Sequence, residues 1–428
     1  MGWDVVRLKN SLKQRITDGP HTTPVFTGDG VPFLSVDGIQ DGELVFDGCR
    51  FVSIEDHEEF RKKAYPKRND LLIGKAASTG KIARVKVDFE FSIWSPLALL
   101  RIDGNLSNPT FVEYMLKSPI SQAEIDNLCT ANTQKNISMD DIPRLLLTRP
   151  PLHEQVVIAA FLDRETAKIN ALVAEQQRLI ELLKEKRQAV ISHAVTKGLN
   201  PDAPLKPSGV EWLGDVPEQW SVRTIAKAST KITNGYVGPT RDILVDTGVP
   251  YIQATHIKSG RINFDDGYFV MPEWSKGHAK SILAEEDVLI VQTGAGTGDV
   301  GLVSNGEVGF NCHALIIVTT NQSVLRGAFL SAVLQSAYGQ EKLASIRTGA
   351  MHPHLNCGEV KYVEIPLPPL IEQAEIVAHI RDTAARFDAL IAEAGIAIAL
   401  LQERRSALIS AAVTGQIDVR GLAQQEAA

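Results

Sequence analysis

The segment "PPLHEQVVIAAFLDRETAKINALVAEQQRLIELLKEKRQAVISHAVT", residues 150–196, returns in altered form as "PPLIEQAEIVAHIRDTAARFDALIAEAGIAIALLQERRSALISAAVT", residues 368–414. About half of the aligned positions are identical. Proline cannot donate to a strand ladder, so any strand that precedes each copy must end at the proline pair. The residues after each pair lack proline and are rich in Leu, Ala, Glu, Lys and Arg, which predicts a long helix in each copy.

Apolar residues recur along both predicted helices at heptad-compatible spacing. In the first copy they are Leu162, Ile169, Leu183 and Val190, with Leu172 and Leu179 at the intermediate positions; in the second they are Ile380, Phe387, Leu401 and Leu408, with Leu390 and Ala397. This pattern predicts a coiled-coil seam. Gln176 and Ala394, and Lys186 and Arg404, occupy further slots and make the seam imperfect. Gly198 and Gly415 follow the last periodic residues and are the expected C-caps.

The repeat extends beyond the helices. Residues 31–52 lie over 249–270 without a gap, and residues 78–85 lie over 296–303. Short β-branched runs punctuated by Gly, Asn and Pro, such as "VLIVQT" and "YVEIPLP", predict strand-rich lobes before each helix. The chain is therefore one unit used twice: lobe, helix, lobe, helix.

This order of parts predicts the fold class. The first helix carries the chain away from the first lobe, and the second helix must run back to pair with it. We therefore expect an α+β protein with two mixed, strand-rich lobes separated by two long antiparallel helices that form a coiled coil, with a pseudo-two-fold internal repeat. The expected divisions are a first lobe at 1–150, a central helix at 151–198, a linker at 199–217, a second lobe at 218–367, a C-terminal helix at 368–417 and a tail at 418–428.

The stretch "TGAGTGDVG", residues 293–301, contains G-x-G-x-x-G and raises the question of a nucleotide loop. A dinucleotide loop requires a helix after the glycines, but a β-branched, turn-rich segment follows here. The first copy, "KAASTGKIA", keeps only Gly80 of the three glycines, and its imitation of a Walker A loop has Ile82 where Ser or Thr is needed. The glycines therefore predict a tight hairpin with a positive φ angle.

The loops of the two copies differ while their frames agree. Lys81 lies over Asp299, and Lys75 lies over Thr293. Loops rich in Gly, Ser, Thr, Lys and Asn bring N–H groups and short polar side chains close to a charged backbone such as that of DNA. Two readers of different short sequences would differ in this way, and so would two surface loops under neutral drift.

The composition argues against a membrane-spanning protein and against a disulfide-stabilised one. No apolar run is long enough to span a membrane, and four scattered cysteines without a C-x-x-C pair favour a reducing, cytoplasmic setting. His352, His354 and Cys357 cluster in sequence, with Cys312 and His313 upstream, but we expect a polar loop and no metal site there. The net charge of −7 is unusual for a free-standing nucleic-acid binder.

The segments "NDLLIGKAASTGKIARV", "EDVLIVQTGAGTGDVGLV" and both long-helix copies resemble those of specificity subunits of type I restriction–modification systems, and the similarity covers nearly the whole chain. The resemblance implies two target-recognition domains that each read half of a split DNA site, and helices that set the gap between the halves. It also implies two modification (methylase) subunits docked on the helices and restriction (translocase/nuclease) subunits beside them. S-adenosylmethionine, ATP and Mg would then act on these partners, and this chain would be a non-catalytic reader without a cofactor of its own. A DNA-reading subunit that is held between partner subunits need not neutralise every DNA phosphate itself. The acidic net charge of the chain is therefore compatible with DNA binding by the complex.

The resemblance also places candidate contacts on the matching loops, where Lys and Arg suit phosphate or guanine and Gln suits adenine. The DNA-binding candidates are His21, Thr22, Thr23, Lys75, Ser78, Thr79, Lys81, Gln134, Lys135, Tyr236, Thr240, Arg241, Gln292, Thr297, Arg347, His352 and His354. For subunit docking, the expected exposed helix positions include Glu154, Gln155, Glu372 and Gln373. Acidic residues in a first turn also simply stabilise a helix N-terminus.

Two other classes of function remain open from the residues. One is a coiled-coil scaffold with carbohydrate- or protein-binding lobes, which would have no adenine-methylase gene beside its own. The other is a nucleotide-using enzyme, which would bind labelled nucleotide as the purified chain.

Overall fold

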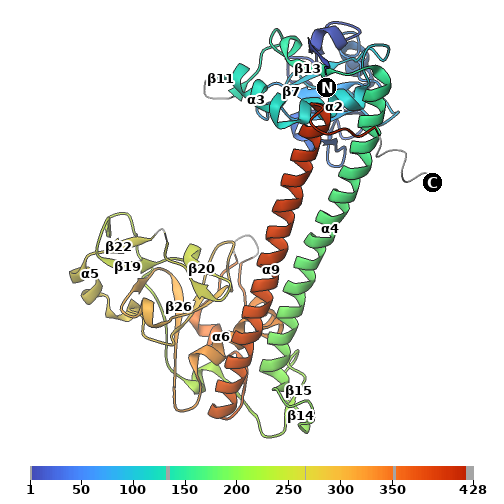
Figure 1. Ribbon diagram of the computed structural model, residues 1–428. Coiled ribbons are helices and arrows are strands. Elements are labelled where there is room, and N and C mark those ends of the chain that lie inside the picture. Colours follow the sequence, from blue (N-terminus) through green and yellow to red (C-terminus); the bar gives the residue numbers. More distant parts are fainter. Residues whose placement is uncertain (1, 132–134, 266, 350–352, 421–428) are drawn as a thin grey trace. The chain divides into compact units, whose positions relative to one another are not determined.

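The computed structural model describes residues 2–131, 135–265, 267–349 and 353–420 (Figure 1). The chain divides into two compact units, each of which joins a lobe to parts of both long helices. Unit 1 comprises Met1–Gln177 and Gly395–Ala428, and unit 2 comprises Arg178–Ala394. Each compact unit is thus assembled from both sequence repeats.

The two long helices are α4 (Leu152–Lys197) and α9 (Leu370–Val413). In unit 1 the start of α4 packs against the end of α9, with Leu162 and Ala412 in one hydrophobic cluster. In unit 2 the end of α4 packs against the start of α9, so the helices are antiparallel in both units. Gly198 and Gly415 end the helices with φ angles of 78° and 73°, which confirms both as C-caps.

The predicted seam is half right. Residues of its first line, such as Leu162 and Ile169, are buried. Its second line is wrong by one residue: Leu172, Leu179 and Leu390 are 42–46% exposed. The line that faces the partner helix lies one position later, and its members are buried or half-buried: Thr166, Val173, Ile180, Arg187 and Ala194 on α4, and Ala384, Ile391, Ile398, Arg405 and Ala412 on α9. A second line of apolar residues can lie three or four residues after the first line in a heptad. The three leucines lie at the spacing of three, so the prediction chose that line instead of the one at the spacing of four.

Each unit is built around one four-stranded antiparallel sheet. In unit 1 the strand order is β2-β10-β7-β8, and in unit 2 it is β17-β26-β23-β24. The strands are β2 (Thr17–Asp18), β10 (Leu97–Leu100), β7 (Leu71–Gly74), β8 (Ile82–Arg84), β17 (Ser229–Asn234), β26 (Leu315–Thr320), β23 (Val288–Val291) and β24 (Val300–Leu302). The equivalent strand order confirms the internal repeat at the level of the fold.

The central strands are mostly apolar because both faces of each sheet are covered. In unit 1, Leu71 and Ile73 join one hydrophobic cluster while Leu72 joins another. In unit 2, Val288 and Ile290 lie in one cluster and Leu289 in a second. Alternate residues of a strand point to opposite faces, so a strand between two cores reads as a continuous apolar run.

Smaller sheets and short helices complete the lobes, and nearly all of them occur in equivalent pairs. The further sheets have the orders β6-β3-β9, β18-β22-β19-β25, β1-β13, β16-β27, β4-β5, β20-β21, β11-β12 and β14-β15. In unit 1 these strands are β1 (Asp4–Arg7), β3 (Val31–Leu34), β4 (Ile39–Gln40), β5 (Glu43–Leu44), β6 (Arg50–Val52), β9 (Ser92–Ile93), β11 (Thr130–Ala131), β12 (Lys135–Asn136) and β13 (Leu146–Arg149). In unit 2 they are β14 (Leu205–Pro207), β15 (Asp215–Pro217), β16 (Ser221–Thr224), β18 (Leu244–Val245), β19 (Val249–Ile252), β20 (Ile257–Lys258), β21 (Arg261–Ile262), β22 (Tyr268–Val270), β25 (Asn311–Cys312) and β27 (Glu364–Leu367).

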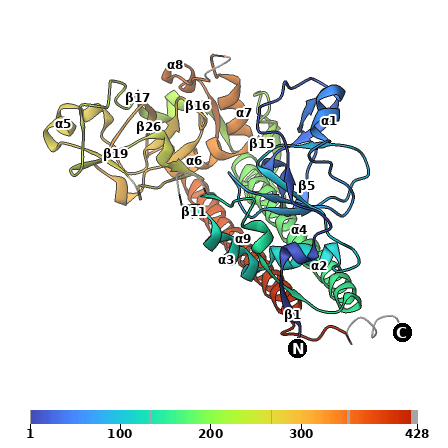
Figure 2. The same ribbon diagram turned by 90° about the horizontal axis from the view of Figure 1, so that it is seen from above.

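The short helices are α1 (Ile54–Phe60), α2 (Pro109–Lys117), α3 (Pro119–Leu128), α5 (Pro272–Gly277), α6 (Gly327–Gln335), α7 (Ala337–Ser345) and α8 (Cys357–Val360). In unit 1, α2 lies beside α4, and α3 lies beside the end of α9 (Figure 2). The Asn108 side chain accepts a hydrogen bond from the Phe111 N–H and caps α2, whose first residue is proline.

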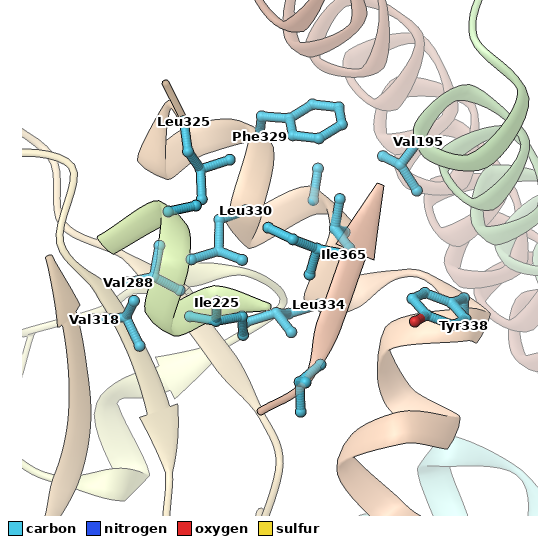
Figure 3. Packing of buried hydrophobic residues seen from close by; sticks show 14 of the residues in the cluster. Val195, Ile225, Val288, Val318, Leu325, Phe329, Leu330, Leu334, Tyr338 and Ile365 are labelled. Atoms are coloured by element: carbon cyan, nitrogen blue, oxygen red, sulfur yellow. The ribbon is translucent and has the colours of Figure 1, made fainter. Parts of the chain in front are cut away.

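The main core of unit 2 connects its lobe to its helices (Figure 3). Phe329, Leu330 and Leu334 of α6 meet Val288 of β23 on one side and Val195 of α4 on the other. The lobe therefore shares one apolar core with the helix segments of its own unit.

Candidate nucleic-acid interface

The two glycine-containing stretches form equivalent hairpins. β7 and β8 pair antiparallel in unit 1, and β23 and β24 do so in unit 2. Gly80 and Gly298 have φ angles of 86° and 94°, and their N–H groups donate to the carbonyls of Gly74 and Val291. A strand follows the glycines in both copies, and Gly301 itself lies in β24. The hairpin prediction is confirmed, although residues 75–81 and 292–299 make wider connections than the tight turn we expected.

The strand register corrects one residue equivalence between the two repeats. Leu97 lies opposite Gly74 in unit 1, and Leu315 lies opposite Val291 in unit 2. Lys75 is therefore equivalent to Gln292 and not to Thr293, because the hairpin connection of unit 2 is one residue longer. The ungapped alignment could not show where the additional residue lies.

Three loops meet around Asp18 in unit 1. The Asp18 carboxylate lies 2.5 Å from the Nζ atoms of Lys63 and Lys75, and 3.2 Å from His21 Nε2. Burial alone would raise the pKa of Asp18, but the hydrogen bonds from the two lysines outweigh it and lower the pKa below its ordinary value. We expected Lys75 on an accessible loop, but it is 8% exposed and its charge is already paired. Asp18 was not among the predicted site residues, since nothing in the sequence places it near residue 75.

The remaining candidates of unit 1 surround the same hairpin. Thr79 Oγ1 donates to the carbonyls of Lys75 and Lys135, at 3.0 and 2.7 Å. Lys81 is exposed, and its Nζ donates to the carbonyl of Ile39 at 3.0 Å. Lys135 lies 2.6 Å from the Asp126 carboxylate. Ser78 is half-buried and Thr22 and Thr23 are exposed, whereas Gln134 lies outside the described residues.

In unit 2 the equivalent hairpin is held to the segment that follows α7. Arg347 Nη2 donates to the Thr297 carbonyl at 2.7 Å, and Thr297 Oγ1 donates to the Pro353 carbonyl at 3.2 Å. His354 exchanges backbone hydrogen bonds with Thr348. Gln292 and Thr297 are each 6% exposed, which contradicts the expectation that both side chains lie on an open loop. His352 lies outside the described residues.

An aromatic cluster flanks the loop that carries three further DNA-binding candidates of unit 2, which are Tyr236, Thr240 and Arg241. The Tyr236 ring meets Trp274 and His278 edge-on, at centroid distances of 5.0 and 5.2 Å. Trp274 and His278 stack on each other at 3.9 Å. Thr240 is half-buried and Arg241 is exposed. The Trp274–His278 pair is not among the residues predicted from the sequence, where a four-residue spacing is its signal.

The predicted docking residues include two that are not exposed. Gln155 Oε1 accepts from the Asn108 N–H at 2.8 Å, and Gln155 Nε2 donates to the Pro150 carbonyl at 2.8 Å. Gln373 makes the same pair of bonds with the Arg326 N–H and the Pro368 carbonyl, both at 2.9 Å. Gln155 and Gln373 are 1% and 0% exposed, so the expectation of exposed glutamines is wrong. Their recurrence has a structural reason: each ties its lobe to the start of a long helix.

The two glutamates next to them are half-buried. Glu154 Oε1 lies 3.9 Å from Arg420 Nη1, so this carboxylate has a cation of its own unit nearby. The docking role assigned to Glu154 and Glu372 remains a prediction.

In the part of the chain that the structure describes, no group of three or more His, Cys, Asp or Glu side chains is arranged to hold a metal ion. In the same residue ranges, no helix is long and apolar enough to cross a bilayer. Cys49, Cys129, Cys312 and Cys357 are free thiols, and burial raises the pKa of the Cys312 thiol to about 12.

Solved structures have the same fold. One chain, from a structure that addresses complex assembly and conformational transition of the type I R-M system, superposes with a TM-score of 0.72 at 15% identity, covering 96% of this chain and 97% of that one. The HsdS subunit from Thermoanaerobacter tengcongensis superposes with a TM-score of 0.50 at 16% identity, covering 97% of each chain.

Curated relatives match over most of their length. The type I restriction enzyme EcoBI specificity subunit of Escherichia coli is 26% identical over 92% of this chain and 82% of its own length. The StySPI specificity subunit of Salmonella potsdam is 24% identical over 92% of this chain and 84% of its own. The family model for the type I restriction modification DNA specificity domain matches twice, at residues 3–182 and 217–394. The chain therefore belongs to the type I restriction–modification DNA specificity family.

Proposed function

We propose that this chain reads a bipartite DNA site, with one half read by the loops of each unit. One observation carries the proposal: the hairpin frames agree in register, while the side chains on them differ in chemistry. Lys81 is replaced by Asp299 at an equivalent position, and both of these side chains are exposed. Lysine pairs with guanine or phosphate, whereas a carboxylate accepts from cytosine. Different side chains at equivalent positions of two similar hairpins suit the reading of two different half-sites.

We also propose that modification subunits dock on the long helices. The support is a pair of exposed leucines that recurs in each unit, one on each helix. In unit 1 they are Leu172 and Leu400, and in unit 2 they are Leu390 and Leu182, all between 44 and 60% exposed. Large exposed apolar side chains at equivalent positions suit two equivalent partner surfaces.

In this proposal the chain supplies recognition and its partners supply chemistry. The modification subunits would methylate adenine with S-adenosylmethionine, and restriction subunits would use ATP and Mg, in the cytoplasm where the chromosome lies. The acidic net charge of −7 fits a reader that depends on partners for part of the phosphate neutralisation.

Methylome sequencing of a host with and without the gene tests the proposal. We expect a methyladenine motif of two specified parts and an unspecified gap to disappear when the gene is deleted. Swapping residues 1–150 for the corresponding lobe of a relative should change one half of the motif and leave the other unchanged. An intact system whose methylome stays the same after deletion would refute the proposal.

A further inference from the structure

A groove occurs at the same place in both units, next to the hairpin. In unit 1 it has a volume of about 430 Å³ and is lined by Lys81 of the hairpin, Lys117 of α2, Gln122 of α3 and Arg405 of α9. In unit 2 a groove of about 300 Å³ has Asp299, Gln335, Gln340 and Arg187 at the equivalent positions. Each groove therefore combines the hairpin of one repeat with an arginine from the long helix of the other repeat.

The two arginines stand in the helix seam, where apolar residues are usual. In both of them the Nε atom is buried and has no hydrogen-bond partner among the described residues. These Nε atoms have almost no accessible surface, so an acceptor from outside the chain can meet each arginine only at its Nη groups.

Only in unit 2 is the arginine neutralised within the chain. Arg187 Nη1 lies 3.3 Å from Asp388 Oδ1. The residue equivalent to Asp388 in unit 1 is Asn170, and Arg405 forms no ion pair within the described ranges. The unit 2 groove also contains Asp299 where the unit 1 groove has Lys81.

The charge balance of the unit 1 groove is consequently positive. The Lys117 charge is paired with Glu113 at 2.5 Å, whereas Lys81 donates only to a neutral carbonyl. Asp41 is exposed and is the carboxylate on the lining of this groove. Lys81 and Arg405 therefore present two cationic groups against one exposed carboxylate.

We propose that Arg405 and Lys81 bind a phosphate of the DNA backbone in this groove, so that the reader of the first half-site takes a backbone contact from the helix of the second repeat. The inference rests on the proposed function, which places the hairpin on DNA. The Arg405 side chain is half-buried and forms no ion pair in the residue ranges that the structure describes, and the two Nη groups of a guanidinium suit phosphate oxygens. The groove of unit 2, where Asp388 and Asp299 already satisfy the charge, makes no such contact.

The salt dependence of DNA binding tests this asymmetry, because each phosphate contact contributes about 0.9 to the slope of log K against log salt concentration. The full chain, bound to its modification subunits, is titrated with a duplex that carries the bipartite site found by methylome sequencing. We expect R405Q to lower the slope by about 0.9, so that binding loses about 3.5-fold less affinity between 50 and 200 mM salt than the wild type does. N170D, which introduces the carboxylate of unit 2 beside an intact arginine, should lower the slope equally.

The matched control is R187Q at the equivalent position of unit 2, whose slope should equal that of the wild type. R405K, which keeps the charge, should retain the slope. The inference is overturned if R405Q and N170D keep the wild-type slope, or if R187Q lowers it as much as R405Q does. If the wild-type complex binds no bipartite site, the proposed function fails first and the inference fails with it.

Discussion

Replacing Gln155 by alanine should selectively destabilise unit 1. The side chain is 1% exposed and makes two short hydrogen bonds, one from the Asn108 N–H and one to the Pro150 carbonyl. Alanine would leave both backbone groups without these partners. At about 1–3 kcal/mol for each of the two unsatisfied buried groups, the free energy of unfolding of unit 1 should fall by about 2–6 kcal/mol.

Hydrogen exchange read out by mass spectrometry can locate this loss, because global unfolding of two units need not be a two-state process. Exchange should accelerate at the Asn108 amide and across unit 1 in Q155A, and across unit 2 in Q373A. Q177A, at an exposed position of the same helix, should be neutral or slightly stabilising. Equal protection of the Asn108 amide in Q155A and Q177A would show that the glutamine does not tie the lobe to the helix.

Three further perturbations address the hairpins and helices. Because the pKa of Asp18 is lowered in the folded protein, its carboxylate stabilises the fold above the ordinary pKa of 3.8, and this stability is lost as pH falls through the folded pKa. The free energy of unfolding, measured with urea, should therefore fall less between pH 7 and pH 2 in D18N than in the wild type. Equal losses in the two proteins would contradict the assignment. G298A places a Cβ at a φ angle of 94° and should cost about 1–2 kcal/mol in thermal unfolding, whereas G28A, with open space around it, should cost less; similar values would argue against backbone strain. L172E combined with L390E should abolish co-purification of the modification subunits without changing the circular dichroism spectrum, and undiminished co-purification would exclude this docking surface.

The sequence predicted the architecture well because the repeat supplied an internal comparison. Two Pro-free segments with the same apolar spacing indicated two long helices, and the glycines that the copies did not share excluded a nucleotide loop. The seam error shows the limit of this reasoning. Leu172 and Leu179 fit a heptad as well as Val173 and Ile180 do, and only the packed helices decide between the two lines.

The candidate site was predicted less completely. Lys75 and Gln292 were selected as accessible contacts, but the structure buries both. Burial depends on which loops meet, and Asp18 reaches Lys75 across 57 residues of sequence. No local pattern encodes a contact of that length.

By itself, the sequence determined the duplication, the long helices and the turn chemistry at Gly80 and Gly298, because these depend on local spacing and backbone freedom. Only the tertiary structure decided which side chains are already paired. Asp388 is equivalent to Asn170 in the sequence, but only the packed helices show that Arg187 faces Asp388 and that Arg405 has no carboxylate partner in the described part of the chain. The reason is that electrostatic pairing is set by distances between groups remote in sequence, and those distances exist only once the helices have packed.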